Sequence, residues 1–176
     1  MKKLLSLLIL TGTLFAQANN VFTLNPSVNS AGMGNVGIAH ADVKNVFHNP
    51  AFAGLRESHQ EISYVDWLPN LTDDMGYQSI LYTSDLGWSS ELFYFNYGEQ
   101  TQADQGGIIL GDFESASFRL SGGYGFQIKD WMFGARLNLY NHSFIDDLDI
   151  DMNYGFDLGA YKEFGNTSVG IVLKDV

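Results

Sequence analysis

Residues 150–160 read Ile150-Asp-Met-Asn-Tyr-Gly-Phe-Asp-Leu-Gly-Ala160, and this stretch decides the fold class. Apolar side chains occupy every second position and alternate with Asp, Asn and Gly. Successive side chains of a strand point to opposite faces, so a period of two over this length predicts a β-strand with one apolar and one polar face. We therefore expect an all-β protein.

Outward from this stretch, other segments show strand patterns bounded by turn signals. Residues 112–128 alternate clearly, with Arg119 on the polar face, and residues 131–144 place Arg136 in the same way. In residues 76–97 apolar side chains fall on both faces, so their facing stays open. The expected strands number about seven and span 60–68, 76–84, 88–97, 112–128, 131–144, 150–160 and 167–174.

The connections between these strands alternate in length. Short turns are expected at 85–86, 129–130 and 165–166, and longer polar connections at 70–74, 98–111 and 141–149. This alternation is typical of the periplasmic turns and external loops of an outer-membrane β-barrel. A soluble antiparallel sandwich can show the same alternation. Charged Arg119, Arg136 and Asp157 on the polar faces favour the barrel, because a wet lumen accommodates them.

The first 18 residues have the pattern of a secretory signal peptide. Lys2 and Lys3 precede an apolar run over 4–15, and a small-x-small site follows at 16–18. Removal of these residues would leave 7 basic and 20 acidic side chains, a formal charge of −13. Such a surface repels nucleic acid. The rest of the sequence contains no run of about 18 apolar residues, so no membrane-spanning helix is expected there.

Overall composition also favours a barrel that faces lipid. Aromatic residues make up 14% of the chain, 19 residues are glycine, and cysteine is absent. Without cysteine, neither disulfides nor a thiolate zinc site is available. A transmembrane barrel uses aromatic girdles at its two interfaces and an apolar stripe on every strand.

Residues 19–55 differ from the strands and are rich in small side chains. We expect Gly32, Gly34 and Gly37 to allow close approach to a barrel wall. These glycines match G-x-G-x-x-G, but no buried strand precedes them, so dinucleotide binding is not expected.

The end of that segment carries two further structural signals. Asp42 is expected to cap one helical turn that runs through Phe47. Asn49-Pro50-Ala51 is expected to leave the helical region and set the exit into the first strand.

Motifs for catalysis are missing from the sequence, which contains neither G-x-S-x-G nor H-E-x-x-H. The four histidines show no ligand spacing. The acidic run 146–151 could offer oxygen ligands to calcium but lacks the glycine and terminal glutamate of an EF-hand. We expect no enzyme activity, no cofactor and no metal site.

Several motifs in one order resemble the PorV/PorQ family of outer-membrane proteins, which is related to the FadL long-chain fatty-acid transporters. They are residues 20–24, the Gly-Met-Gly segment, Asn49-Pro50-Ala51, 63–69 and 95–98. The opening and residues 63–69 look more PorQ-like. The similarity covers residues 19–176.

The resemblance implies a monomeric outer-membrane barrel of about fourteen strands, with an N-terminal hatch over 19–55. It implies partners from type IX secretion, either secretion components or cargo; the alternative is FadL-like transport of hydrophobic small molecules through the lumen. A soluble periplasmic β-protein is a third hypothesis. Residues 56–176 would then be the first half of the barrel, and we expect the chain to be incomplete at its C-terminus.

Overall fold

The computed structural model describes residues 21–72, 74–143 and 152–175. The expected signal peptide over 1–18 lies outside these residues, as do the acidic run 146–151 and the start of the stretch 150–160.

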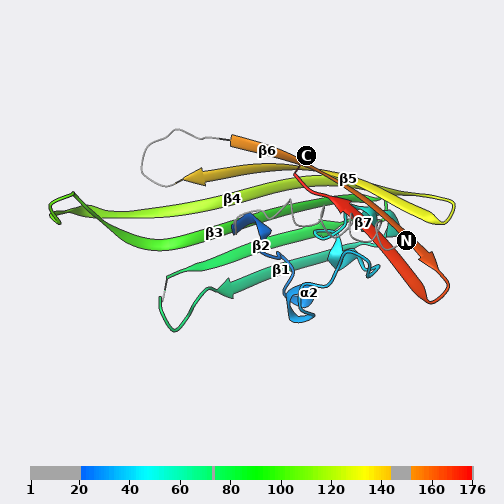
Figure 1. Ribbon diagram of the computed structural model, residues 1–176, viewed down its shortest axis with the longest axis horizontal. Coiled ribbons are helices and arrows are strands. Elements are labelled where there is room, and N and C mark those ends of the chain that lie inside the picture. Colours follow the sequence, from blue (N-terminus) through cyan, green and yellow to red (C-terminus); the bar gives the residue numbers. More distant parts are fainter. Residues whose placement is uncertain (1–20, 73, 144–151, 176) are drawn as a thin grey trace, which may run out of the picture.

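Seven strands form one antiparallel sheet in which every strand pairs with its neighbours in chain order (Figure 1). The fold class expected from the sequence, an all-β antiparallel sheet, is therefore confirmed. The strands are β1 His59–Asp66, β2 Gly76–Thr83, β3 Trp88–Ala103, β4 Ile109–Ile128, β5 Trp131–Ser143, β6 Met152–Phe164 and β7 Thr167–Leu173.

One expected boundary is wrong: the long polar connection over 98–111 is mostly strand. β3 continues to Ala103 and β4 begins at Ile109, so their hairpin extends past the rest of the sheet (Figure 1). A bulge between Asn96 and Glu99 lets pairing resume in a shifted register, and Gly98 takes a φ of +74° there. Sequence polarity suggested a loop because both faces of this extension are exposed.

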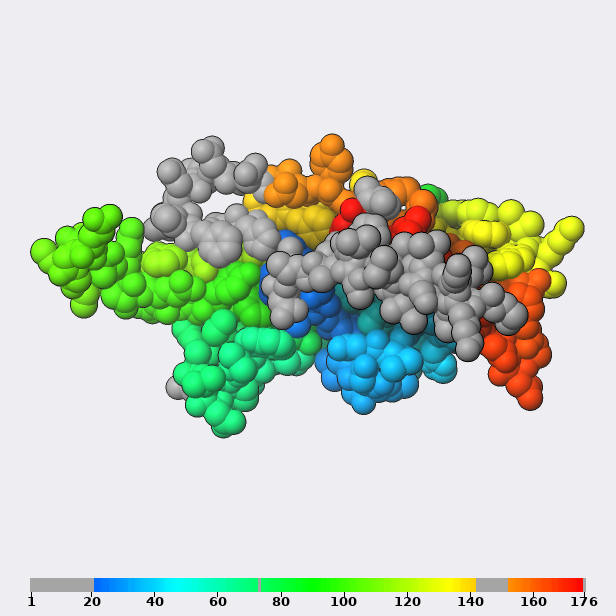
Figure 2. Space-filling view, viewed as in Figure 1, coloured from blue at the N-terminus to red at the C-terminus, as the bar shows by residue number. Residues whose placement is uncertain are grey.

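Residues 21–58, called the N-terminal segment below, contain only short helical elements. They are η1 Val21–Thr23, α2 Val28–Gly32, η2 Val43–Asn45 and η3 Pro50–Leu55. The segment lies across one face of the sheet, in blue and cyan in Figures 1 and 2. We call this covered side the inner face and the opposite side the outer face. None of the helices among the described residues has the length and apolar character needed to cross a membrane.

On β4, β5 and β6, charged side chains are buried on the inner face and leucines are exposed on the outer face, which is the reverse of a soluble protein. Arg119, Arg136 and Asp157 are buried on the inner face, whereas Leu120, Leu137 and Leu158 are 42–48% exposed on the outer face. The open facing of residues 76–97 is also settled. Tyr77, Leu81, Glu91, Phe93 and Phe95 face inward, and Ile80, Tyr82, Leu92 and Tyr94 face outward.

Apolar contacts between the N-terminal segment and the inner face form three small clusters. Phe22 packs with Tyr77, Phe93 and Phe95; Ala51 and Phe52 pack with Met132 and Tyr161; Val46 and Ala53 pack with Leu81. The N-terminal segment thus supplies the partner surface that the inner face needs to exclude water.

Candidate functional site on the inner face

Four adjacent strands each place one charged side chain on the inner face. Glu91 on β3 accepts a hydrogen bond from Arg119 Nε on β4 at 2.9 Å, and Asp157 on β6 accepts one from Arg136 Nε on β5 at 3.0 Å. All four side chains are at most 5% exposed. Two acids balance two bases, as burial of charge requires. We call these four residues the charged ladder.

The arginines of the charged ladder also bind the main chain of the N-terminal segment. Arg119 Nη1 donates to the Phe22 carbonyl. Arg136 donates to the carbonyls of Val46 at 3.3 Å and Phe47 at 3.0 Å. Because a guanidinium offers five donors in a plane, one side chain can bind a carboxylate and a carbonyl together. The charged ladder therefore holds the N-terminal segment through its main-chain carbonyl groups.

The ring of Phe47 lies among three cations. The guanidinium carbons of Arg119 and Arg136 are 4.6 Å and 5.2 Å from its centroid, and Lys174 Nζ is 4.3 Å away. Cations at these distances are attracted to the face of an aromatic ring. Phe47 thus adds a side-chain contact at the point where Arg136 binds its carbonyl.

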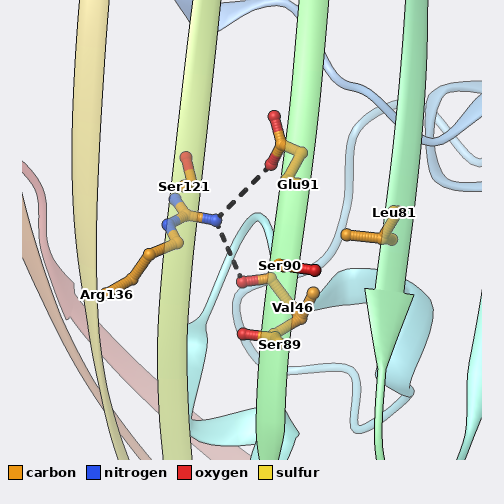
Figure 3. Close-up of a pocket in the computed structure, with 7 residues that line it drawn as sticks. All are labelled: Val46, Leu81, Ser89, Ser90, Glu91, Ser121 and Arg136. Carbon is orange, nitrogen blue, oxygen red and sulfur yellow. Dashed lines mark hydrogen bonds and ion pairs between the residues drawn. The ribbon is translucent and has the colours of Figure 1, made fainter.

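Glu91 is the least satisfied member of the ladder. Among the described residues its Oε2 has no hydrogen-bond partner, and Arg136 Nη1 lies 4.0 Å away. Figure 3 shows the two side chains directed toward each other among Ser89, Ser90 and Ser121. The gap beside them has no room for a water molecule. The attraction of Arg136 is thus the main compensation for this oxygen.

Glycines of the sheet allow the main chain of the N-terminal segment to lie directly on the strands. A Cβ at Gly134 would overlap the Pro50 carbonyl, and one at Gly159 would overlap the Asn49 side chain. Gly125 meets Gly54 and Gly170 meets Ile38 in the same way. These four contacts lie on β4, β5, β6 and β7, so a path free of side chains crosses the inner face.

Asn49 joins three parts of the structure through its side chain. Its Nδ2 donates to the carbonyls of Ile38 at 2.9 Å and Ala160 at 3.2 Å, and its Oδ1 accepts from Ala51 N at 3.0 Å. Asn49 is fully buried. It therefore connects the N-terminal segment to β6 while it caps η3.

His48 is buried beside Asn49 in a neutral setting. Its Nε2 lies 3.0 Å from both Asn25 Nδ2 and Ser30 Oγ, which suits a neutral ring whose Nε2 accepts a hydrogen bond. Burial, reinforced by the charges of Lys174 and Arg136, lowers the pKa of His48 from 6.5 to about 4. The imidazole is consequently uncharged at neutral pH.

The glycines predicted from the sequence have other roles than expected. Among the described residues, a Cβ at Gly32 or Gly34 would meet nothing within 4 Å, so close approach to the described wall does not explain either residue. Gly34 has a φ of +78°, which favours glycine. Gly37 is in tight contact, but with the His48 ring in its own segment.

The other predicted residues lie in and around the capped turns. Asp42 Oδ1 accepts from Lys44 N at 2.9 Å and caps η2, which ends at Asn45. Asn49-Pro50-Ala51 does not lead into the first strand: it starts η3, because proline fits the first helical position. The exit lies at Arg56, whose φ is +57°.

Sequence reasoning missed Glu91, Phe47 and the sheet glycines. Gly155 and Gly159 stand on the polar side of the 150–160 alternation, which could have pointed to a close contact there. Of the histidines, His48 is in the site. Among the described residues, no group of His, Cys, Asp and Glu could hold a metal ion.

On the outer face, the strand register lines up rows of apolar side chains. Ile62 pairs with Ile80, Ile80 with Leu92, Leu92 with Leu120, and Leu120 with Leu139. Nearer the short turns, aromatic rings follow one another at centroid distances of 4.8–6.4 Å across β3 to β6: Trp88, Tyr124, Phe126, Phe133, Trp131 and Phe164. Aliphatic rows bordered by aromatics are the surface that a bilayer favours.

Comparison with known proteins gives no match: no family model, no curated protein and no solved structure matches this chain. The PorV/PorQ resemblance therefore stays a prediction, and the function has to be argued from the two faces themselves.

Proposed function

We propose that this chain forms the wall of an outer-membrane β-barrel in which the N-terminal segment acts as a hatch. The observation that carries the proposal is the reversed division of polarity: aliphatic rows face outward, and the charged ladder faces inward beneath a covering segment. In water the outer face would expose large apolar area, whereas in lipid that area is matched to its surroundings. Export through the signal peptide over 1–18 belongs to the same proposal.

The function that we propose for this barrel is type IX secretion or surface attachment through protein partners. The resemblance to the PorV/PorQ family motivates this. The β3–β4 hairpin supports it, because it extends beyond the sheet and exposes Ile108, Ile109 and Leu110 at 61–70%. Asp104 accepts hydrogen bonds from Gly106 N and Ile108 N at 2.8 Å, which fixes the turn that presents these side chains. Ordered, exposed apolar residues of this kind suit a protein partner.

Cell fractionation tests the location. Cells expressing the full reading frame should yield the protein in the outer membrane, with gel migration that differs between heated and unheated samples. Recovery in the soluble periplasm would overturn the proposal and favour the third hypothesis.

Site-specific crosslinking tests the partner. A photo-crosslinking amino acid at Gln105, in the β3–β4 turn, should join the protein to type IX components. The same amino acid at Ile80 on the outer face serves as the matched control and should give no protein adduct. Equal adducts at both positions, or none at Gln105, would count against a secretion role.

A second candidate function is binding and transport of hydrophobic small molecules. It is favoured by a pocket of about 470 Å³ on the inner face, lined mainly by apolar and aromatic side chains. Pockets of this size and lining commonly hold small ligands.

A further inference from the structure

The pocket lies between residues 21–24 on one side and, on the other, the connection between β1 and β2 and the middle of β3. Its lining includes Val21, Leu24, Trp67, Met75, Phe95 and Tyr97. Residues 21–24 belong to the N-terminal segment, so ligand binding and the position of that segment share residues. This pocket is separate from the charged ladder, none of whose members lines it.

Three aromatic rings dominate the side of the pocket opposite residues 21–24. The rings of Trp67 and Phe95 lie 6.1 Å apart, and those of Phe95 and Tyr97 lie 4.7 Å apart. Trp67 is fixed by its backbone N–H, which donates to the Met75 carbonyl at 2.9 Å. Aromatic rings that border a cavity attract an organic cation placed over their faces.

The stretch of sequence that contains Trp67, Met75, Phe95 and Tyr97 is acidic. From Glu57 to Phe118 the sequence contains 11 acidic residues and no lysine or arginine. Asp74 is next in sequence to the lining residue Met75. Its carboxylate accepts from Glu99 N at 2.7 Å and lies beside Gly98, the neighbour of the lining residue Tyr97.

The nearest arginine of the charged ladder cannot serve an anionic ligand here. Arg119 is 2% exposed, and its guanidinium binds Glu91 and the Phe22 carbonyl. A long-chain fatty acid that entered this pocket with its carboxylate first would place that group beside aromatic rings, with no cation among the lining residues to receive it, which is costly.

We propose that this pocket binds a small apolar molecule that carries a positive group of the quaternary-ammonium type and that it rejects carboxylates. The proposal rests on the second candidate function, ligand binding, and assigns the chemical class of the ligand. It does not depend on a secretion role.

Equilibrium dialysis of the purified, detergent-solubilised protein tests this with two water-soluble probes of similar size. Benzyltrimethylammonium carries the positive group and 3-phenylpropanoate carries a carboxylate. The cation should bind at least about tenfold more tightly, since a desolvated cation–π contact contributes on the order of 1–2 kcal/mol. Heat-dependent gel migration of each sample establishes that the protein is folded.

Matched variants separate the pocket from general attraction of a cation to an acidic protein. W67A should lower the affinity for benzyltrimethylammonium about tenfold, and W67F, which keeps a ring, should lower it less. W88A removes a tryptophan from the outer face and should leave binding unchanged. D74N keeps the acceptor for Glu99 N but loses the charge, so it should weaken binding several-fold, whereas D104N in the β3–β4 turn should not.

Two results would overturn the proposal. In the first, 3-phenylpropanoate binds at least as tightly as benzyltrimethylammonium and W67A weakens its binding. The pocket would then bind hydrophobic ligands without preferring a cation, and the second candidate function would stand. Binding of neither probe in a Trp67-dependent way would remove both the proposal and that candidate function.

Discussion

On β4, Arg119 is 2% exposed while the next residue, Leu120, is 47% exposed. The same contrast holds on β5 for Arg136 and Leu137, at 5% and 48%. In a soluble sheet the leucine would face the core and the arginine would face water. The two faces are therefore built for two different surroundings, although one backbone carries both.

The inner face is stabilised by buried ion pairs and hydrogen bonds to the N-terminal segment, whereas the large aliphatic side chains of the outer face stay partly exposed. Each ladder arginine joins a carboxylate, a carbonyl of the N-terminal segment and the Phe47 ring. Outer-face leucines are aligned with one another by the strand register, as Leu92 is with Leu120, and stay partly exposed. The loss of stability caused by a substitution on the inner face should accordingly depend on which hydrogen-bonding atoms are removed. The loss caused by a substitution on the outer face should depend on whether lipid or water surrounds that face.

The largest effect is expected at Arg136. R136A removes the cation that pairs with buried Asp157 and the donor to the Phe47 carbonyl, and breaking a buried pair from one side costs about 3–5 kcal/mol. Urea unfolding in lipid vesicles should show this loss. L137A, one residue away on the outer face, is the control and should lose clearly less. Equal losses would mean that the charged ladder is not a stabilising site.

Leu92 on the outer face tests the surroundings directly. If lipid covers this face, L92R should cost about 2–4 kcal/mol near the bilayer centre, whereas an arginine in water at this 45% exposed position would be nearly neutral. Unfolding in vesicles measures the difference between L92R and L92A. A neutral result for L92R would refute contact with lipid.

Gly134 tests the close contact between the two layers. G134A places a methyl group against the Pro50 carbonyl and should cost about 1–3 kcal/mol. The N-terminal segment should then be cut faster by trypsin at Lys44 and Arg56. G122A is the matched control, because a Cβ at Gly122 meets nothing within 4 Å. Identical cleavage of the two variants would contradict the proposed packing.

Asn49 tests the polar connection between the N-terminal segment and β6. N49A loses the bonds to Ile38, Ala160 and Ala51 and should cost about 1–2 kcal/mol, lowering folded yield without abolishing export. N70A, in the exposed β1–β2 loop, is the control. Heat-dependent migration and protease resistance that match the unmodified protein would count against this role.

The smallest effect is a pH dependence that arises at His48. Its pKa is about 4 in the folded protein and 6.5 ordinarily, so between these values the unfolded chain binds more protons and stability falls as pH falls. From pH 7 to pH 5.5 the loss should be about 1 kcal/mol. H48Q should remove this dependence, while H59Q, on β1, should retain it. An unchanged pH profile in H48Q would contradict the assignment.

Much of the fold could be predicted because side-chain period is local information. Alternation over 112–128 and 131–144 gave the strands and placed Arg119 and Arg136 on a polar face. Capping of η2 by Asp42 is equally local. The β3–β4 extension was missed because a two-stranded ribbon exposed on both faces has no apolar period to reveal it.

The candidate site could not be predicted to the same extent, because it is made by contacts between distant parts of the chain. Phe47 lies among Arg119, Arg136 and Lys174, and Pro50 lies on Gly134. For the same reason, Gly32 and Gly34 were assigned a close approach that belongs to Gly134 and Gly159. A glycine in the sequence indicates that another segment can pack closely at that position, but it does not indicate which segment does.

The sequence by itself determined most of the strands, the short turns between them and, in the clearly alternating strands, which side chains share a face, since these follow from neighbouring residues and from a backbone whose side chains alternate. Only the tertiary structure decided that the polar faces are covered by the N-terminal segment and which arginine pairs with which acid. The physical reason is that burial and charge pairing depend on what approaches a face in space. What approaches a face is set by packing between segments that are distant in sequence; Asn49 and Ala160, for example, are more than a hundred residues apart.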